Sequence, residues 1–329
     1  MQRGALPMTK DMGNRASVKR GVESQKFILV LTLLGMWILL AILSPHFLSV
    51  SNLSSIGTSI ATIAMLAVGQ TFVILTGGID LSVGNVVGLV GVVTALAMTN
   101  GFGMYGGALA GLAVGVLCGI ANGLMIGRGK LPPFIAGLGM MGITRGIALL
   151  VSGGFPIIVP FQQFGNLGIG TILGAVPVPV VIMLAFYALG FYVLRHLRFG
   201  RHTYAIGSNE ETARLAGINV ARHKTLVYAL CGFTAAVAGL LETARLFSAY
   251  PTAGSGYELD SIAAVVIGGT SMSGGEGSIV QTLIGALTMA TLRNGCNLLG
   301  ISPFIQQVVI GLIIIGAVYM DRVRGGRVA

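Results

Sequence analysis

The sequence predicts an all-α integral membrane protein of about ten transmembrane helices, with both termini in the cytoplasm and some helices short or broken. Hydrophobic residues make up 54% of the 329 residues and charged residues only 9%, whereas soluble domains carry about 25% charged residues. The mean hydropathy is +0.88. Apolar stretches recur along the chain, and basic residues are confined to some of the segments between them.

Ten apolar stretches are candidate spans, since a spanning helix needs about 20 mainly apolar residues. They are 27–43, 58–76, 83–99, 104–126, 134–151, 171–194, 225–247, 261–273, 278–294 and 304–320. The stretches 261–273 and 278–294 are short or interrupted by glycine, so we expect each to be tilted or partly re-entrant. Glycine recurs every fourth residue from Gly103 to Gly127. Small residues at this spacing allow close helix packing, which we favour over a sliding surface.

Basic residues orient these spans. They gather in the tail 1–26, the turn 127–133, the segment 195–224 and the C-terminus, whereas the loops 44–57, 100–103, 152–170 and 295–303 contain no Lys or Arg. The positive-inside rule places the basic segments in the cytoplasm, and only an even number of crossings agrees with it. We therefore predict a basic cytoplasmic tail at 1–26, one transmembrane domain at 27–322 and a cytoplasmic tail at 323–329.

Composition argues against several other classes. The net charge of +10 lies at the ends of apolar stretches, where it marks topology rather than a nucleic-acid surface. Cys118, Cys231 and Cys296 lie in apolar runs without a C-x-x-C pair, and the four histidines lack metal-ligand spacing, so we expect no disulfide and no metal site. The sequence has no G-x-x-x-x-G-K-[ST] phosphate loop and no paired catalytic carboxylates. We expect no enzyme activity and no cofactor bound by this chain.

Two glycine-rich breaks interrupt the apolar pattern, at 76–84 and 268–277. A broken helix frees backbone groups that protein or water must satisfy, and broken segments in corresponding positions indicate a transport path. Asp80 in the first break is either part of a gate or the cap of the following helix, and both roles are compatible. The gate or pathway candidates are Gly77, Gly78, Asp80, Ser82, Gly268, Gly269, Ser271, Asn294 and Asn297.

Other polar residues inside spans have plainer expected roles. Glu242 and Arg245 are three residues apart, so we expect an ion pair on one helix face. Several amides could hydrogen-bond a polar solute, but for each one an interhelical contact is the more frequent role. They are Gln70, Asn85, Asn122, Asn294, Gln306 and Gln307.

Four motifs resemble the permease subunits of bacterial ABC importers for sugars, of the ribose-transporter type. They are LTGGIDLSVG at 75–84, AIGSNEETARLAGINV at 205–220, PTAGSGYELD at 251–260 and NGCNLLG at 294–300. The resemblance covers about residues 27–322, and Cys296 and the long basic tail depart from it. It implies a multi-pass protein of the inner membrane, surrounded by lipid and working as a homodimer. It also implies a cytoplasmic ATPase subunit, which binds ATP and Mg, and a periplasmic sugar-binding protein.

The hydrophilic segment 195–224 matches the cytoplasmic coupling element of such permeases, which sits in a groove of the ATPase. The segment holds six of the 20 Lys and Arg residues. We predict a helix from about Asn209 to Ala216, with Asn209 as N-cap and Gly217 at the exit. Leu215 and Ile218 are its expected apolar contacts. The ATPase-coupling candidates are Asn209, Glu210, Glu211, Ala213, Arg214, Leu215 and Gly217.

The same resemblance predicts that the loops 44–57, 152–170 and 248–260 dock the periplasmic binding protein, with Glu258 and Asp260 as possible acidic contacts. The residues by themselves do not identify the sugar, and the resemblance favours ribose. The main alternative function is an ion-coupled secondary transporter of a small polar solute, with Asp80 or Glu242 as its coupling site.

Overall fold

The computed structural model describes residues 27–172 and 174–325. An N-terminal helix spans Phe27–Leu43. The remaining elements are α2 Val50–Leu75, α3 Val83–Ala97, the π-helical η1 Met98–Phe102, α4 Gly103–Gly127, α5 Pro133–Ser152, β1 Ile157–Ile158, the 3-10 helix η2 Gln162–Gly165, α6 Asn166–Ile169, β2 Thr171–Ile172, β3 Val176–Pro177, α7 Val178–His196, α8 Arg198–Ser208, α9 Glu210–Leu215, α10 Val220–Leu246, β4 Ser248–Ala249, α11 Tyr257–Ile267, α12 Ile279–Leu298 and α13 Pro303–Gly325.

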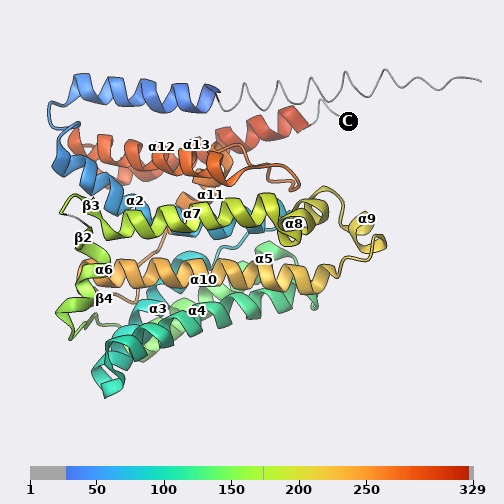
Figure 1. The fold of residues 1–329 in the computed structure, drawn as a ribbon, viewed down its shortest axis with the longest axis horizontal. Helices are drawn as coiled ribbons and strands as arrows, with labels where there is room; N and C mark the ends of the chain where they lie inside the picture. Colours follow the sequence, from blue (N-terminus) through green and yellow to red (C-terminus); the bar gives the residue numbers. More distant parts are fainter. Residues whose placement is uncertain (1–26, 173, 326–329) are drawn as a thin grey trace, which may run out of the picture.

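The long helices lie side by side in one bundle (Figure 1). The short strands form two antiparallel pairs at one end of the bundle, the hairpin β2–β3 and the pair of β1 with β4. Helices α8 and α9 lie at the other end, where the N-terminal helix begins and α13 ends (Figure 1). The predicted tail 1–26 and residues 326–329 lie outside the described residues. Residues 323–325, predicted as tail, continue α13.

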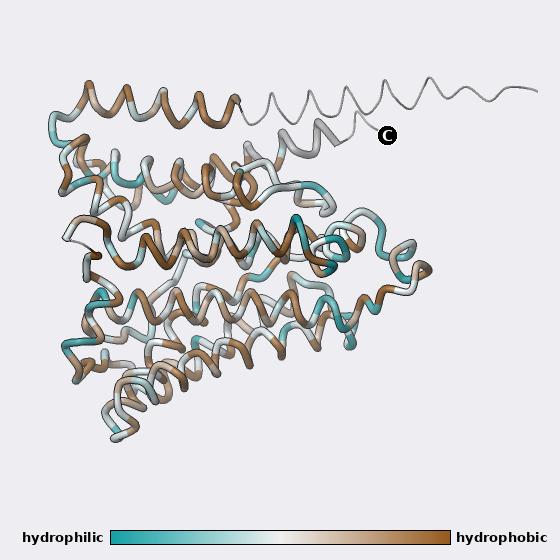
Figure 2. The backbone as a smooth tube through the Cα atoms, viewed as in Figure 1, coloured by the Kyte–Doolittle hydropathy of each residue, from teal (hydrophilic) through white to brown (hydrophobic). Residues whose placement is uncertain are grey.

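Hydropathy along the backbone identifies a membrane protein (Figure 2). Among the described residues, five helical stretches are long and apolar enough to cross a membrane: Val50–Leu75, Val83–Gly127, Pro133–Ser152, Val178–His196 and Val220–Leu246. The helix Phe27–Leu43 and the stretch Pro303–Gly316 are apolar but shorter. The mostly helical, membrane-spanning class is therefore confirmed, while the count of ten crossings stays a prediction.

Three of the predicted helices have wrong boundaries. Helix α2 begins at Val50 rather than 58, because Ser49 caps it by accepting a hydrogen bond from the Asn52 amide at 3.3 Å. Its polar first turns concealed the start of the helix, so the predicted loop 44–57 is half helix. Residues 171–172 and 176–177 form the β2–β3 pair instead of belonging to the first turns of α7, which begins at Val178. Helix α11 begins at Tyr257 and ends at Ile267, because the glycine pair at 268–269 stops it.

Helix α10 lies in the centre of the bundle and packs closely on α4. The four-residue glycine period of α4 faces it from Gly115 to Gly127. At Gly119, for example, a β-carbon would lie 3.0 Å from the Ala229 Cα. Gly111 faces α3 instead, and Gly107 faces both α3 and Met98 of η1, whereas a β-carbon on Gly103 would meet nothing within 4 Å. The period therefore brings helix backbones together in close packing, as favoured from the sequence.

Candidate functional site

Helix α9 has the ends that the sequence predicts. The Asn209 side chain accepts a hydrogen bond from the Thr212 amide at 2.8 Å, and Glu210 and Glu211 occupy the first turn, where the helix dipole favours acids. Gly217 has φ +85°, and the amides of Gly217 and Ile218 donate to carbonyls of the last turn. This Schellman arrangement satisfies the exposed C-terminal carbonyls. The predicted helix 209–216 is thus confirmed to within one residue.

The two faces of α9 differ sharply. Ala213 is buried in a small cluster with Ile206 of α8 and Val220 of α10. Ile218, expected to contact a partner, packs on this same internal cluster. Leu215 is 84% exposed. The Leu215 side chain is therefore accessible to another molecule.

Ion pairs tie α9 to the start of α10. Glu210 accepts from Lys224 at 2.6 Å and from Arg214 at 3.0 Å. The hydrogen bond from Lys224 is the largest cause that lowers the pKa of Glu210 below its ordinary value. Glu211 and Arg214 remain largely exposed. The coupling candidates therefore form one ordered surface, anchored from beneath by Ala213 and Glu210.

A cleft of about 800 Å³ opens beside α9. Its walls are the α4–α5 turn and the junction between α9 and α10. Lys130 and Pro132 line one side, and Arg214 and Lys224 the other. Glu210 is the acidic residue that lines this cleft, among the basic residues Lys130, Arg214 and Lys224. The turn 127–133 and the segment 195–224, both predicted on the cytoplasmic side from their basic residues, thus share one surface.

The two glycine-rich breaks end their helices in the same way. At the end of α2, Gly77 has φ +75° and its amide donates to the Ile74 carbonyl, while the Gly78 amide donates to the Val73 carbonyl. At the end of α11, Gly269 has φ +84° and its amide donates to the Val266 carbonyl, while the Thr270 amide donates to the Val265 carbonyl. Both are Schellman caps, which need the positive φ that glycine adopts without strain.

The structure also brings the two breaks into contact. The Gly275 amide donates to the Leu75 carbonyl at 3.0 Å, and a β-carbon on Gly274 would lie 2.8 Å from the Gly77 nitrogen. The Ser271 amide closes the second break by donating to the Glu276 carbonyl at 2.9 Å. Gly268 lies against α12, where a β-carbon would meet the Gln281 backbone. Seven of the predicted pathway residues therefore belong to one joined structure: Gly77, Gly78, Asp80, Ser82, Gly268, Gly269 and Ser271.

The Asp80 side chain links the end of the first break to Ser82 and to α4. Its side chain is 1% exposed and accepts from the Ser82 amide at 2.9 Å and the Ser82 hydroxyl at 2.6 Å, just before α3 begins. Asn122 of α4 donates to the same oxygen at 3.2 Å, and the Gln70 amide contacts the Asp80 backbone. Asp80 therefore closes a turn onto Ser82, the N-cap residue of α3, rather than accepting from an amide inside that helix, so the predicted cap is wrong. A role in gating stays a prediction.

Asn294 and Asn297 do not join the breaks. Asn294 and Asn52 of α2 exchange amide hydrogen bonds of 2.8 and 3.0 Å. Asn297 accepts from Gln306 of α13 at 2.8 Å. Each is an interhelical contact, the role that we considered more frequent for such amides.

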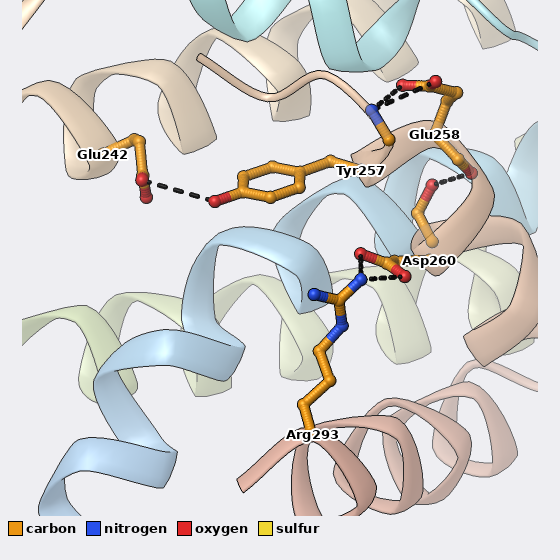
Figure 3. Close-up of polar contacts among 7 residues, drawn as sticks. Glu242, Tyr257, Glu258, Asp260 and Arg293 are labelled. Carbon is orange, nitrogen blue, oxygen red and sulfur yellow. Dashed lines mark hydrogen bonds and ion pairs between the residues drawn. The ribbon is translucent and has the colours of Figure 1, made fainter. Parts of the chain in front are cut away.

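A second polar network connects α10, α11 and α12 (Figure 3). Glu242 accepts from Arg245 at 2.7 Å, which confirms the predicted pair, and also from Tyr257 at 3.3 Å. Arg293 donates to both oxygens of Asp260, at 2.7 and 2.8 Å.

Glu258 accepts from the Gly256 amide, and both it and Asp260 are buried. These two carboxylates therefore serve internal contacts, so the expectation that they offer an acidic surface to a binding protein is wrong. Among residues 27–172 and 174–325, no group of three or more His, Cys, Asp or Glu side chains is placed to hold a metal ion.

Sequence reasoning missed helix α8, which joins α9 to the breaks. The Tyr204 hydroxyl donates to the Gly277 carbonyl at 2.9 Å. Burial raises the pKa of Tyr204, so the hydroxyl keeps its proton. A β-carbon on Gly275 would lie 2.7 Å from the Ser208 hydroxyl. The one signal was the length of segment 195–224, which exceeds what a single six-residue helix requires.

Comparison with known proteins agrees with this architecture. The chain is 45% identical to the ribose import permease protein of Escherichia coli (strain K12) over 94% of this chain and 97% of that protein. It is 46% identical to the ribose import permease protein of Bacillus subtilis (strain 168), over 88% and 91%. It is 39% identical to the L-arabinose transport system permease protein of Escherichia coli (strain K12), over 87% of each chain. Residues 52–318 match the family model described as "Branched-chain amino acid transport system / permease component", so this chain belongs to that family of transport permeases.

Proposed function

We propose that this chain is the membrane-spanning permease of an ATP-driven sugar importer in the bacterial inner membrane, with ribose as the leading substrate. Similarity along nearly the full chain to permeases named for ribose and L-arabinose supports a sugar as cargo. The permease is a non-catalytic subunit. It forms the translocation path and performs no bond chemistry.

The single observation that supports coupling to an ATPase is the construction of α9. The helix is capped at both ends and fixed underneath by Ala213 and Glu210, and it presents Leu215 outward. Such a helix transmits a displacement better than a flexible loop does, because the bundle fixes its orientation. We propose that a cytoplasmic ATPase subunit binds α9 and the adjoining cleft, and that ATP and Mg are bound by that subunit.

The proposed orientation follows from charge. Basic residues are concentrated near α8 and α9, so this end faces the cytoplasm and the hairpin end faces the periplasm. A periplasmic sugar-binding protein delivers the sugar at the hairpin end, and a second copy of the permease completes the path within the lipid bilayer. ATP binding moves the two copies of α9, and the path then opens to the opposite side. Differential contacts of the ATPase with the two states supply the free energy.

The ion-coupled alternative has less support. Its candidate coupling carboxylates, Asp80 and Glu242, are both buried and engaged by neighbouring side chains. The Asp80 carboxylate accepts hydrogen bonds from Ser82 and Asn122, and the Glu242 carboxylate accepts them from Thr62, Arg245 and Tyr257. Both oxygens of Glu242 accept hydrogen bonds, so an ion would have to displace a donor there before it could bind. The donors to Asp80 engage its Oδ1.

Reconstitution tests the proposal. The permease, a co-expressed ATPase subunit and a sugar-binding protein are placed in proteoliposomes, and uptake of radiolabelled ribose is measured with internal or external ATP. We expect uptake only when ATP is on the α9 side, with unlabelled ribose competing better than L-arabinose. Deletion of 209–217 or Glu211→Arg should remove the ATPase during co-purification. Accumulation of ribose by the permease alone under an ion gradient, without ATP, would refute the proposal.

A further inference from the structure

Helix α8 lies between α9 and both helix breaks. Three of its residues touch the breaks directly. The Tyr204 hydroxyl donates to the Gly277 carbonyl at 2.9 Å, and Ser208 lies against Gly275. Gly207 is in contact at once with the last residue of α2, where the first break begins, and with the second break, because a β-carbon there would overlap the Leu75 carbonyl and the Gly275 amide.

The connection from α8 to α9 is short and stiff. Only Asn209 separates the two helices, and its amide still donates to the Ala205 carbonyl of α8 at 3.1 Å. Ile206 of α8 packs on Ala213 of α9 in their shared cluster. Because covalent, hydrogen-bonded and packing contacts all join the two helices, a displacement of α9 carries α8 with it.

We propose that α8 transmits the movement of the coupling helix to both breaks together, with Tyr204 and Gly207 as the positioning residues. The inference rests on the proposed function and goes beyond it, since it assigns the step between ATPase docking and opening of the path. The bond between Gly275 and Leu75 already joins the breaks, so one contact surface on α8 moves two otherwise separate parts of the chain. Gly207 is required because any side chain there would separate α8 from the breaks.

The test compares two variants in the reconstituted complex. Tyr204→Phe deletes one hydroxyl, and Gly207→Ala inserts a methyl group at the contact. We expect both to co-purify with the ATPase and to hydrolyse ATP near the wild-type rate. Sugar uptake per ATP hydrolysed should fall by about two- to tenfold for Tyr204→Phe, the range expected for one lost hydrogen bond. It should fall further for Gly207→Ala.

Matched controls separate this effect from general damage. Tyr105→Phe removes the same hydroxyl from a side chain that is 78% exposed on α4. Gly139→Ala adds the same methyl group on α5, where no atom lies within 4 Å. Both controls should keep wild-type uptake per ATP.

The outcomes distinguish the inference from the proposed function. Wild-type uptake per ATP in an assembled Tyr204→Phe complex would overturn the inference. Loss of ATPase binding by Tyr204→Phe would also overturn it, since the residue would then act in docking. Failure of the wild-type complex to take up sugar with ATP would instead refute the proposed function. Tyr204→Phe keeps the test decisive even if Gly207→Ala fails to fold.

Discussion

Leu215→Ala should weaken binding of the ATPase without destabilising the permease. Leu215 is 84% exposed, so its truncation removes almost no contact within this chain. Full burial of a leucine side chain is worth about 1.5–3 kcal/mol. Alanine retains the β-carbon, so we expect a loss of about 1–2 kcal/mol on docking, or about a 5- to 30-fold weaker affinity. The measurement is titration of the ATPase subunit onto permease in lipid nanodiscs.

Leu150→Ala is the matched control, since Leu150 is also 84% exposed but lies at the end of α5. It should leave the affinity unchanged, and both variants should keep the wild-type unfolding temperature. The reasoning fails if Leu215→Ala binds the ATPase as tightly as the wild type. It fails equally if Leu150→Ala weakens binding to the same extent, because the effect would then not be specific to α9.

Three further changes test the supports of the site. Asn209→Ala removes the cap of α9 and should destabilise that helix by about 1 kcal/mol, seen as faster amide hydrogen exchange over 210–216, whereas unchanged exchange would contradict the cap. Arg245→Ala leaves the buried Glu242 carboxylate without its cation, so the free energy of unfolding should fall by about 3–5 kcal/mol, seen as a lower unfolding temperature. The double variant Glu242→Gln/Arg245→Met should lose less stability, which would show that the unpaired charge is the cause. The hydrogen bond from Lys224 lowers the pKa of Glu210 below its ordinary value of 4.5. The ion pair should therefore stabilise α9 fully above pH 4.5, and this stabilisation should be lost only as the pH falls through the lower pKa of the folded protein. Carboxyl carbon NMR should show that titration, and Lys224→Met should move the Glu210 pKa upward.

Local signals predicted the membrane class and the position of helix α9 well. Apolar stretch length and basic-residue asymmetry follow from the cost of polar groups in lipid, which acts on each segment separately. Helix α9 was predictable because its cap and exit are set by neighbours in sequence, from Asn209 to Gly217. The start of α2 was missed because polar residues occupy its first turns, where Ser49 still caps the helix.

The pathway candidates were harder to assign. Gly77 and Gly269 were recognisable as breaks, because a glycine pair ends a helix by its own backbone preference. Their contact through Gly275 and Leu75 was not, because it joins residues 200 positions apart in the chain. Asn294 carries the same polar signature as a pathway residue, yet it pairs with Asn52.

The sequence by itself determined that this protein spans a membrane, where its helices break and which hydrophilic segment forms a capped helix. Each of these depends on hydropathy, backbone preference or a hydrogen bond within a few residues. Only the tertiary structure decided that Leu215 faces outward while Ile218 packs inward, that Glu258 and Asp260 are buried, and that α8 touches both breaks. Those outcomes depend on which distant surfaces meet, because burial and contact are properties of the packed bundle rather than of any one segment.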